Sequence, residues 1–95
     1  MRNLRINAEN WIEQNPRIYD IFCQFALQAA NKKRKFGVKL LAERVRWEID
    51  MVRSDLKHLK INNNYTAYIA RKLIEDYPML KNYLRLRKVR ETENV

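Results

Sequence analysis

The amino-acid sequence predicts a mainly α-helical protein, a compact bundle of four to five short helices. Two observations carry this prediction: apolar residues recur at helical spacing along most of the chain, and the 95 residues include only one glycine and two prolines. All-β folds need a turn every few residues, and this composition does not supply them. A short strand or β-hairpin around residues 50–62, as in a winged-helix fold, stays open as an alternative, because that stretch fits neither period clearly.

The length predicts a single domain. A chain with 46% hydrophobic and 33% charged residues has enough apolar content for one core. We expect a helical domain over residues 1–90 and a polar tail over residues 91–95. No apolar run reaches the roughly 20 residues that span a bilayer, and no apolar signal region is visible at the N-terminus. These features predict a cytoplasmic protein with no membrane partner.

The stretch between residues 7 and 31 predicts two helices that meet at Asn15-Pro16. Asparagine caps free backbone N–H groups at a helix start, and proline suits the first helical position. The residues that follow place apolar side chains at i, i+3, i+4 and i+7, which forms one buried stripe. The basic tract Asn31–Lys35 ends this helix, and we expect Gly37 to adopt a turn conformation that other residues resist.

A third helix is predicted from Val38, with a buried stripe that reaches Val52. Its opposite face carries charges of alternating sign, which is typical of a solvated face whose charges pair with one another. A fourth helix is expected from Tyr65 to Tyr77, because proline follows and disfavours helix in the residue before it. A last helix is expected to include Leu84.

The positive charge is concentrated in two blocks. Twenty Lys and Arg against eleven Asp and Glu give a net charge of +9. Residues 32–46 carry seven cations against Glu43 alone, and residues 77–90 carry five cations and no acid. A clustered excess favours polyanionic partners, whereas a scattered excess mainly confers solubility. The plainer alternative is a solvated surface on a basic protein.

Two segments supply the candidate binding residues. A basic turn followed by a helix start suits a duplex phosphate backbone. The three consecutive asparagines offer paired donors and acceptors for adenine edges or phosphates, and the alternative is that one caps a helix while the others form a turn. The candidate nucleic-acid-binding residues are Lys32, Lys33, Arg34, Lys35, Lys39, Arg46, Asn62, Asn63, Asn64, Arg71, Arg85 and Lys88.

No motif in the sequence predicts an enzyme. It contains no serine in a glycine elbow, no glycine-rich phosphate loop and no HExxH motif. Cys23 is the only cysteine and His58 the only histidine, and Cys23 falls on an apolar helix side, as buried structural thiols do. No residues have metal-ligand spacing. We therefore expect no catalytic residue, no metal and no cofactor.

The chain resembles a group of small, uncharacterised phage and prophage proteins in several segments: Lys35–Glu48, Leu59–Tyr65, Tyr68–Arg71 and Tyr77-Pro78. Those proteins are basic and helical, and the resemblance covers roughly residues 16–87. The resemblance implies an accessory role, such as handling nucleic acid or blocking a host system. It implies no catalytic residue.

These observations predict a non-enzymatic accessory protein that binds nucleic acid, with duplex DNA as the expected ligand. The alternative is a protein–protein module, an inhibitor or adaptor that uses the same charges on an acidic host protein. An exposed apolar patch around Trp47 would favour that alternative. The small size also leaves a homodimer open. The nucleic-acid hypothesis requires the two basic blocks to fold onto a common side.

Overall fold

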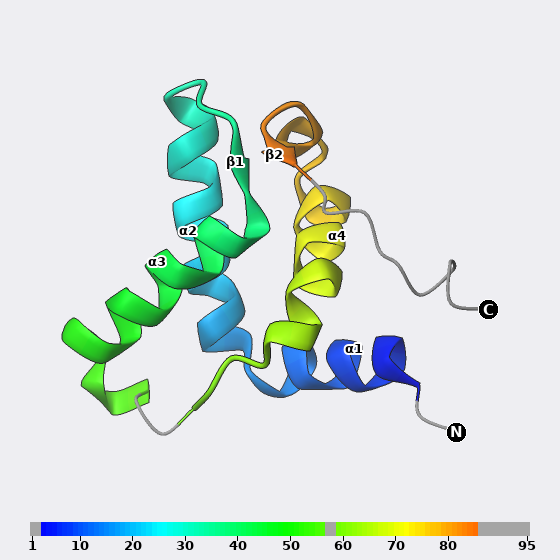
Figure 1. Ribbon diagram of the computed structural model, residues 1–95, viewed down its shortest axis with the longest axis vertical. Helices are drawn as coiled ribbons and strands as arrows, with labels where there is room; N and C mark the ends of the chain where they lie inside the picture. Colours follow the sequence, from blue (N-terminus) through cyan, green and yellow to red (C-terminus); the bar gives the residue numbers. More distant parts are fainter. Residues whose placement is uncertain (1–2, 57–58, 86–95) are drawn as a thin grey trace.

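α-Helices make up most of the chain, as the sequence predicts (Figure 1). The computed structural model describes residues 3–56 and 59–85. The α-helices in these residues are α1 (Leu4–Gln14), α2 (Pro16–Asn31), α3 (Val38–Met51) and α4 (Thr66–Asp76). Short 3₁₀ helices cover Ser54–Leu56, Asn63–Tyr65 and Pro78–Asn82, and two-residue strands form β1 (Phe36–Gly37) and β2 (Leu84–Arg85).

The core lies where α2, α3 and α4 converge. α2 contributes the predicted apolar stripe, in which Ile18 and Phe22 are completely buried. α3 packs Val45 against it and α4 packs Leu73, and both side chains are also inaccessible to solvent. Burying one such side chain contributes about 1.5–3 kcal/mol. α1 runs across the base of α2 and α4 (Figure 1) and adds Ile12 to the same core.

The break between α1 and α2 lies at Asn15-Pro16 as expected, and Asn15 is the N-cap residue of α2, but its side chain makes no capping hydrogen bond there. Its side-chain amide donates to the carbonyl of Trp11 at 2.8 Å, and its backbone N–H donates to Ile12. Asn15 therefore closes the end of α1, because the last carbonyls of α1 lie within its reach and have no partner inside that helix. α1 itself begins one turn earlier than predicted, where Asn3 accepts a hydrogen bond from the backbone N–H of Ile6.

The left-handed backbone position after α2 belongs to Lys33, not to Gly37. Lys33 has a φ of 57°, and its N–H donates to Ala30 while the N–H of Arg34 donates to Ala29. This pair of hydrogen bonds is a Schellman motif, which normally selects glycine at the position of Lys33. Gly37 has φ −98° and ψ 159°, an extended conformation open to any residue. The expectation that Gly37 forms the special turn is therefore wrong.

The strands lie outside residues 50–62. In that stretch the structure has a 3₁₀ helix at Ser54–Leu56, and β1 instead pairs with β2 in parallel. The expected last helix is the short 3₁₀ helix Pro78–Asn82, after which Leu84 begins β2. Both strands gain burial in this way, because Phe36 and Leu84 lie opposite each other and both enter the core.

Three further expectations concern the end of α3, a membrane span and the C-terminal tail. Val52 follows α3 and is 58% exposed, so it does not extend the buried stripe as predicted. In the described part of the chain, no helix combines the length and apolar character needed to cross a bilayer. The expected domain end at residue 90 and polar tail over residues 91–95 lie outside the described residues.

Candidate nucleic-acid interface

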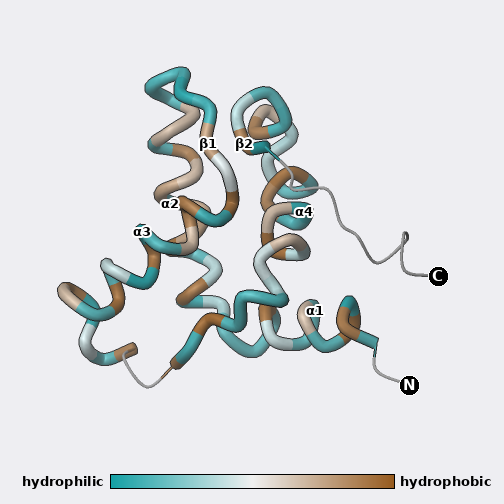
Figure 2. The backbone as a smooth tube through the Cα atoms, viewed as in Figure 1, coloured by the Kyte–Doolittle hydropathy of each residue, from teal (hydrophilic) through white to brown (hydrophobic). Residues whose placement is uncertain are grey.

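The parallel strand pair brings the first basic block of the sequence together with residues 77–85, the described part of the second. β1 directly follows Lys35, and Gly37 in β1 lies opposite Arg85 in β2. The N–H of Phe36 donates to the carbonyl of Tyr83 at 2.9 Å, which ties the two segments. Figure 2 shows hydrophilic residues at the loop before β1 and at the turn before β2, at the same end of the molecule.

The cations at this end keep their charge free. All seven are exposed, and none forms an ion pair with another described residue. We call them the cationic end: Lys32, Lys33, Arg34, Lys35, Lys39, Lys81 and Arg85. By contrast, the ion pairs of the described residues involve other cations, such as Arg17 with Asp55 and Lys72 with Asp76. The field of the cationic end is therefore not neutralised by salt bridges.

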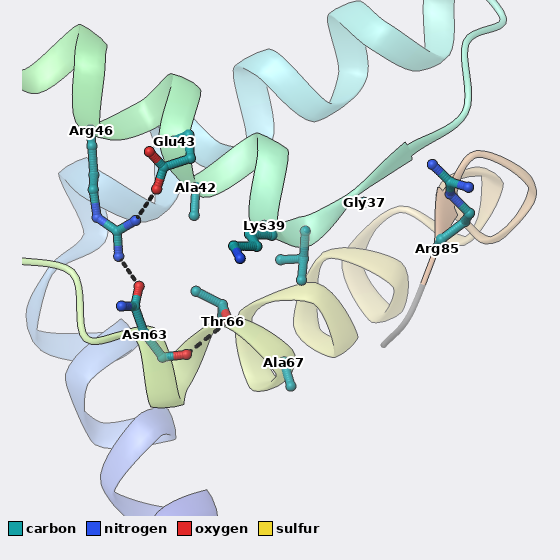
Figure 3. Close-up of a pocket in the computed structure, with 10 residues that line it drawn as sticks. Gly37, Lys39, Ala42, Glu43, Arg46, Asn63, Thr66, Ala67 and Arg85 are labelled. Atoms are coloured by element: carbon teal, nitrogen blue, oxygen red, sulfur yellow. Dashed lines mark hydrogen bonds and ion pairs between the residues drawn. The ribbon is translucent and has the colours of Figure 1, made fainter. Parts of the chain in front are cut away.

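A groove of about 570 Å³ continues from the cationic end between α3 and α4 (Figure 3). Arg85 and Lys39 border it at the strand end, and Asn63 borders it at the other. Its only carboxylate among the described residues is that of Glu43, which is paired with Arg46 at 2.7 Å. Four of the predicted binding residues therefore line the same groove: Lys39, Arg46, Asn63 and Arg85.

Arg46 is held by contacts within the protein. Its guanidinium donates to Glu43, to the carbonyl of Ile61 at 3.2 Å and to the side-chain oxygen of Asn63 (Figure 3). Its side chain is only 30% exposed. Arg46 thus connects α3 to the segment before α4. Its guanidinium N–H groups already donate to these three acceptors within the protein, so they are less available to a ligand.

The three asparagines have different roles. Asn62 accepts a hydrogen bond from the backbone N–H of Asn64 at 2.8 Å and caps the short 3₁₀ helix that leads into α4. Asn63 accepts from Arg46, and its carbonyl accepts from the Thr66 hydroxyl at 2.9 Å. The alternative interpretation, a cap within a turn, describes Asn62. Asn64 is exposed and has no side-chain hydrogen bond among the described residues.

The remaining candidates lie elsewhere. Arg71 borders a different groove, between α1 and α4, together with carboxylates such as Glu13 and Glu75, and its guanidinium lies 5.5 Å from the ring centre of Tyr68. Lys88 lies outside the described residues. Lys81 was not among the sequence candidates although it belongs to the second basic block. The sequence did contain a signal for Lys81, since no acidic residue lies between residues 77 and 90.

The region around Cys23 has the features of a packing site. The thiol is 8% exposed on the core side of α2, and burial raises its pKa above the ordinary value. Nearby, the Tyr19 hydroxyl donates to Asp76 at 2.6 Å. Burial, and then this hydrogen bond, raise the pKa of Tyr19 well above its usual range. A reactive thiol needs the opposite, a lowered pKa. His58 lies outside the described residues.

Within residues 3–56 and 59–85, no three side chains of the histidine, cysteine, aspartate or glutamate type converge as metal ligands would. Comparison with protein-family models, with curated proteins and with solved structures finds no match to this chain. The resemblance to phage and prophage proteins therefore stays a prediction.

Proposed function

We propose that this protein binds nucleic acid through the cationic end and acts without catalysis, with duplex DNA as the expected ligand. The observation that carries the proposal is the β1–β2 pairing, which sets Arg85 beside Gly37 and so joins the first basic block to residues 77–85, the described part of the second. Seven exposed cations without ion pairs among the described residues then lie in, or within a few residues of, the two paired strands. Such a cluster attracts phosphates more strongly than the same charges spread evenly.

The chemistry of the cationic end favours contact with the phosphate backbone over base reading. Five of its seven cations are lysines, which bind phosphate as mobile point charges. Several of the side chains suited to base contacts are engaged elsewhere: Arg46 and Asn63 bind each other, and Asn62 caps a helix. Arg34 and Arg85 have no ion pair among the described residues, but the lysines outnumber them at this end. Of the three asparagines, Asn64 alone has no side-chain hydrogen bond to another described residue. We therefore expect binding with little dependence on base sequence.

An accessory role in the cytoplasm of a phage-infected or prophage-carrying cell belongs to the same proposal. It rests on the resemblance of Lys35–Glu48 and Leu59–Tyr65 to small phage and prophage proteins. A small basic protein that coats or marks duplex DNA without altering it covalently fits such a role.

The test is the salt dependence of binding to a short fluorescent duplex. If about five phosphates are neutralised, the logarithm of the association constant falls with the logarithm of salt concentration at a slope near −4 to −5. Fluorescence anisotropy measures this slope directly. Absence of binding at about 50 mM salt, or an affinity that does not change with salt, would overturn the proposal. A duplex of RNA and a single strand of the same DNA sequence, titrated in parallel, identify the preferred ligand.

A further inference from the structure

Helix α3 has a second apolar face that the protein does not cover. Leu41, Val45 and Ile49 point into the core. On the opposite side Leu40, Trp47 and Met51 recur at i, i+7 and i+11, which places them on one face of an α-helix. They are 67%, 54% and 66% exposed. A solvated helix in a small protein normally carries polar residues at such positions, so this face has the character of an interface.

The tryptophan in this face is supported by its surroundings. The guanidinium of Arg44 lies 5.1 Å from the ring centre of Trp47 and 4.1 Å from that of Phe25 in α2. Arg44 is itself held by Glu48 at 3.0 Å. A cation stacked between two rings restricts both of them. Trp47 is therefore presented in a restricted orientation, and a partner loses less side-chain entropy when it binds there.

An apolar groove of about 550 Å³ lies beside this face, between α2 and α3. Its apolar lining includes Phe25, Ala29 and Leu40. Its cationic rim is formed by Lys32 and Arg34, since the third cation that lines it, Arg44, is paired with Glu48. No carboxylate is among the described residues that line it. An occupant that complements this groove must offer apolar side chains in the middle and negative charge at the edges.

We propose that this groove and the exposed face of α3 bind an acidic amphipathic helix of a partner protein. We call the site the α3 docking surface; it comprises Phe25, Lys32, Arg34, Leu40, Arg44, Trp47 and Met51. A helix laid in a groove anchors side chains at i, i+3 or i+4, and i+7, which matches an apolar stripe that runs along α3. Acidic residues beside those anchors meet the cationic rim.

Charge selects this occupant over a second copy of the chain. A symmetric dimer through the groove brings Lys32 and Arg34 toward the same residues of the other copy, in a protein whose net charge is already +9. Like charges face to face oppose such an association. Leu40 and Met51 also distinguish the site from a platform for unpaired bases, because bases stack on aromatic rings and not on aliphatic side chains.

The test uses a display library of random peptides of about 16 residues, long enough for four helical turns. Selection is made on the full-length protein in nuclease-treated buffer, so that its result is independent of nucleic-acid binding. We expect enriched peptides with apolar residues at helical spacing and Asp or Glu beside them. Trp47→Ala should weaken a synthesised peptide of this kind about 30-fold or more, as truncation of a central anchor does. Lys60→Gln, which removes an exposed cation outside the surface, should leave its affinity unchanged.

Three outcomes overturn the proposal. The first is a selection that enriches no peptide, or peptides without acidic residues. The second is binding that tolerates both Trp47→Ala and a Leu40→Asp, Met51→Asp double variant; these side chains are exposed, so the variants should fold, and circular dichroism checks this. The third is evidence that the surface has another occupant. Such evidence would be a dimer seen in analytical ultracentrifugation, or binding to oligo(dT), if Trp47→Ala abolishes that dimer or that binding.

Discussion

Gly37 in β1 lies opposite Arg85 in β2, in a parallel register that joins two segments far apart in the chain. The pairing is short, and it is stabilised by the side chains beside it, since Phe36 and Leu84 are both buried in the core. The hydrophobic contact thus fixes where the charges lie. This relationship places the described part of the second basic block, residues 77–85, against the first.

The first prediction concerns single cations in the second block. Lys81→Gln and Arg85→Gln should each weaken duplex binding about equally for all sequences and reduce the salt slope by about 1, because each removes one phosphate contact. Both side chains are exposed and unpaired among the described residues, so folding should not change. Anisotropy titrations at several salt concentrations measure both quantities.

Lys60→Gln is the matched control for that experiment. Lys60 is exposed and has no ion pair among the described residues, and it belongs to the segment that leads into α4. That segment lies at the other end of the molecule from the loop before β1 (Figure 1). If Lys60→Gln reduces the slope as much as Lys81→Gln does, binding depends on net charge alone and the cationic end has no special role.

The second prediction separates Arg46 from Lys39, two cations on α3 that border the same groove. Arg46→Met should lower the free energy of unfolding by about 1–2 kcal/mol, since it removes hydrogen bonds to Glu43, Ile61 and Asn63 from a half-buried guanidinium. Lys39→Met should change it by less than about 0.5 kcal/mol, because its charge is solvated. Urea denaturation measures both values. Equal losses would mean that the internal contacts of Arg46 contribute nothing.

The third prediction concerns Lys33, the one residue with a left-handed backbone in residues 3–56 and 59–85. Lys33→Gly should raise the free energy of unfolding by about 0.5–1 kcal/mol, because it relieves a φ of 57° that costs an L-residue about 1–2 kcal/mol. Lys35→Gly removes the same charge where φ is not positive, and should instead destabilise the protein. Thermal unfolding of the two variants checks the difference, and the same sign for both would contradict it.

Gly37→Ser is expected to be tolerated or stabilising, which is the fourth prediction. A Cβ added at Gly37 meets no atom within 4 Å, and the backbone there is extended, as at most helix N-caps. No side chain caps α3, so a serine hydroxyl should supply a capping hydrogen bond, and the gain over glycine is about 0.3 kcal/mol. A loss of stability in thermal unfolding would show that the position needs glycine after all.

The fifth prediction follows from the raised pKa of Tyr19. The folded protein keeps the phenol protonated, so its contribution to stability is complete below the unfolded tyrosine pKa of about 10 and is lost as pH rises above it. Stability should therefore fall from about pH 10 to pH 11, and less steeply in Tyr19→Phe. At neutral pH the variant should lose about 0.5–1.5 kcal/mol with the hydrogen bond to Asp76.

Asp76→Asn is the companion variant for the alkaline experiment. It keeps the phenol and its burial, which is the larger cause of the raised pKa, and removes only the carboxylate. Urea unfolding of this variant should retain part of the alkaline loss. If Tyr19→Phe follows the same pH profile as the unmodified protein, Tyr19 does not titrate as its environment indicates.

Local pattern accounts for the helices and for much of the core. The stripe through Ile18 and Phe22 and the Pro16 helix start depend on neighbours a few residues away, and the sequence predicted them. The same holds for the buried Cys23. The prediction failed at Asn15 and Gly37. The Asn15 side chain was expected to cap α2 but binds the end of α1, and Gly37 was expected in a special turn but is extended. General residue preferences do not say which of two adjacent helix ends a side chain reaches.

The amino-acid order by itself determined the helical class, the apolar stripes and the two blocks of positive charge, because each depends on residues within a few turns of one another. Only the tertiary structure decided that β1 meets β2, that Arg46 binds Asn63 and that Trp47 faces solvent. Those outcomes depend on contacts between distant segments, which are chosen by what the whole chain can bury at once.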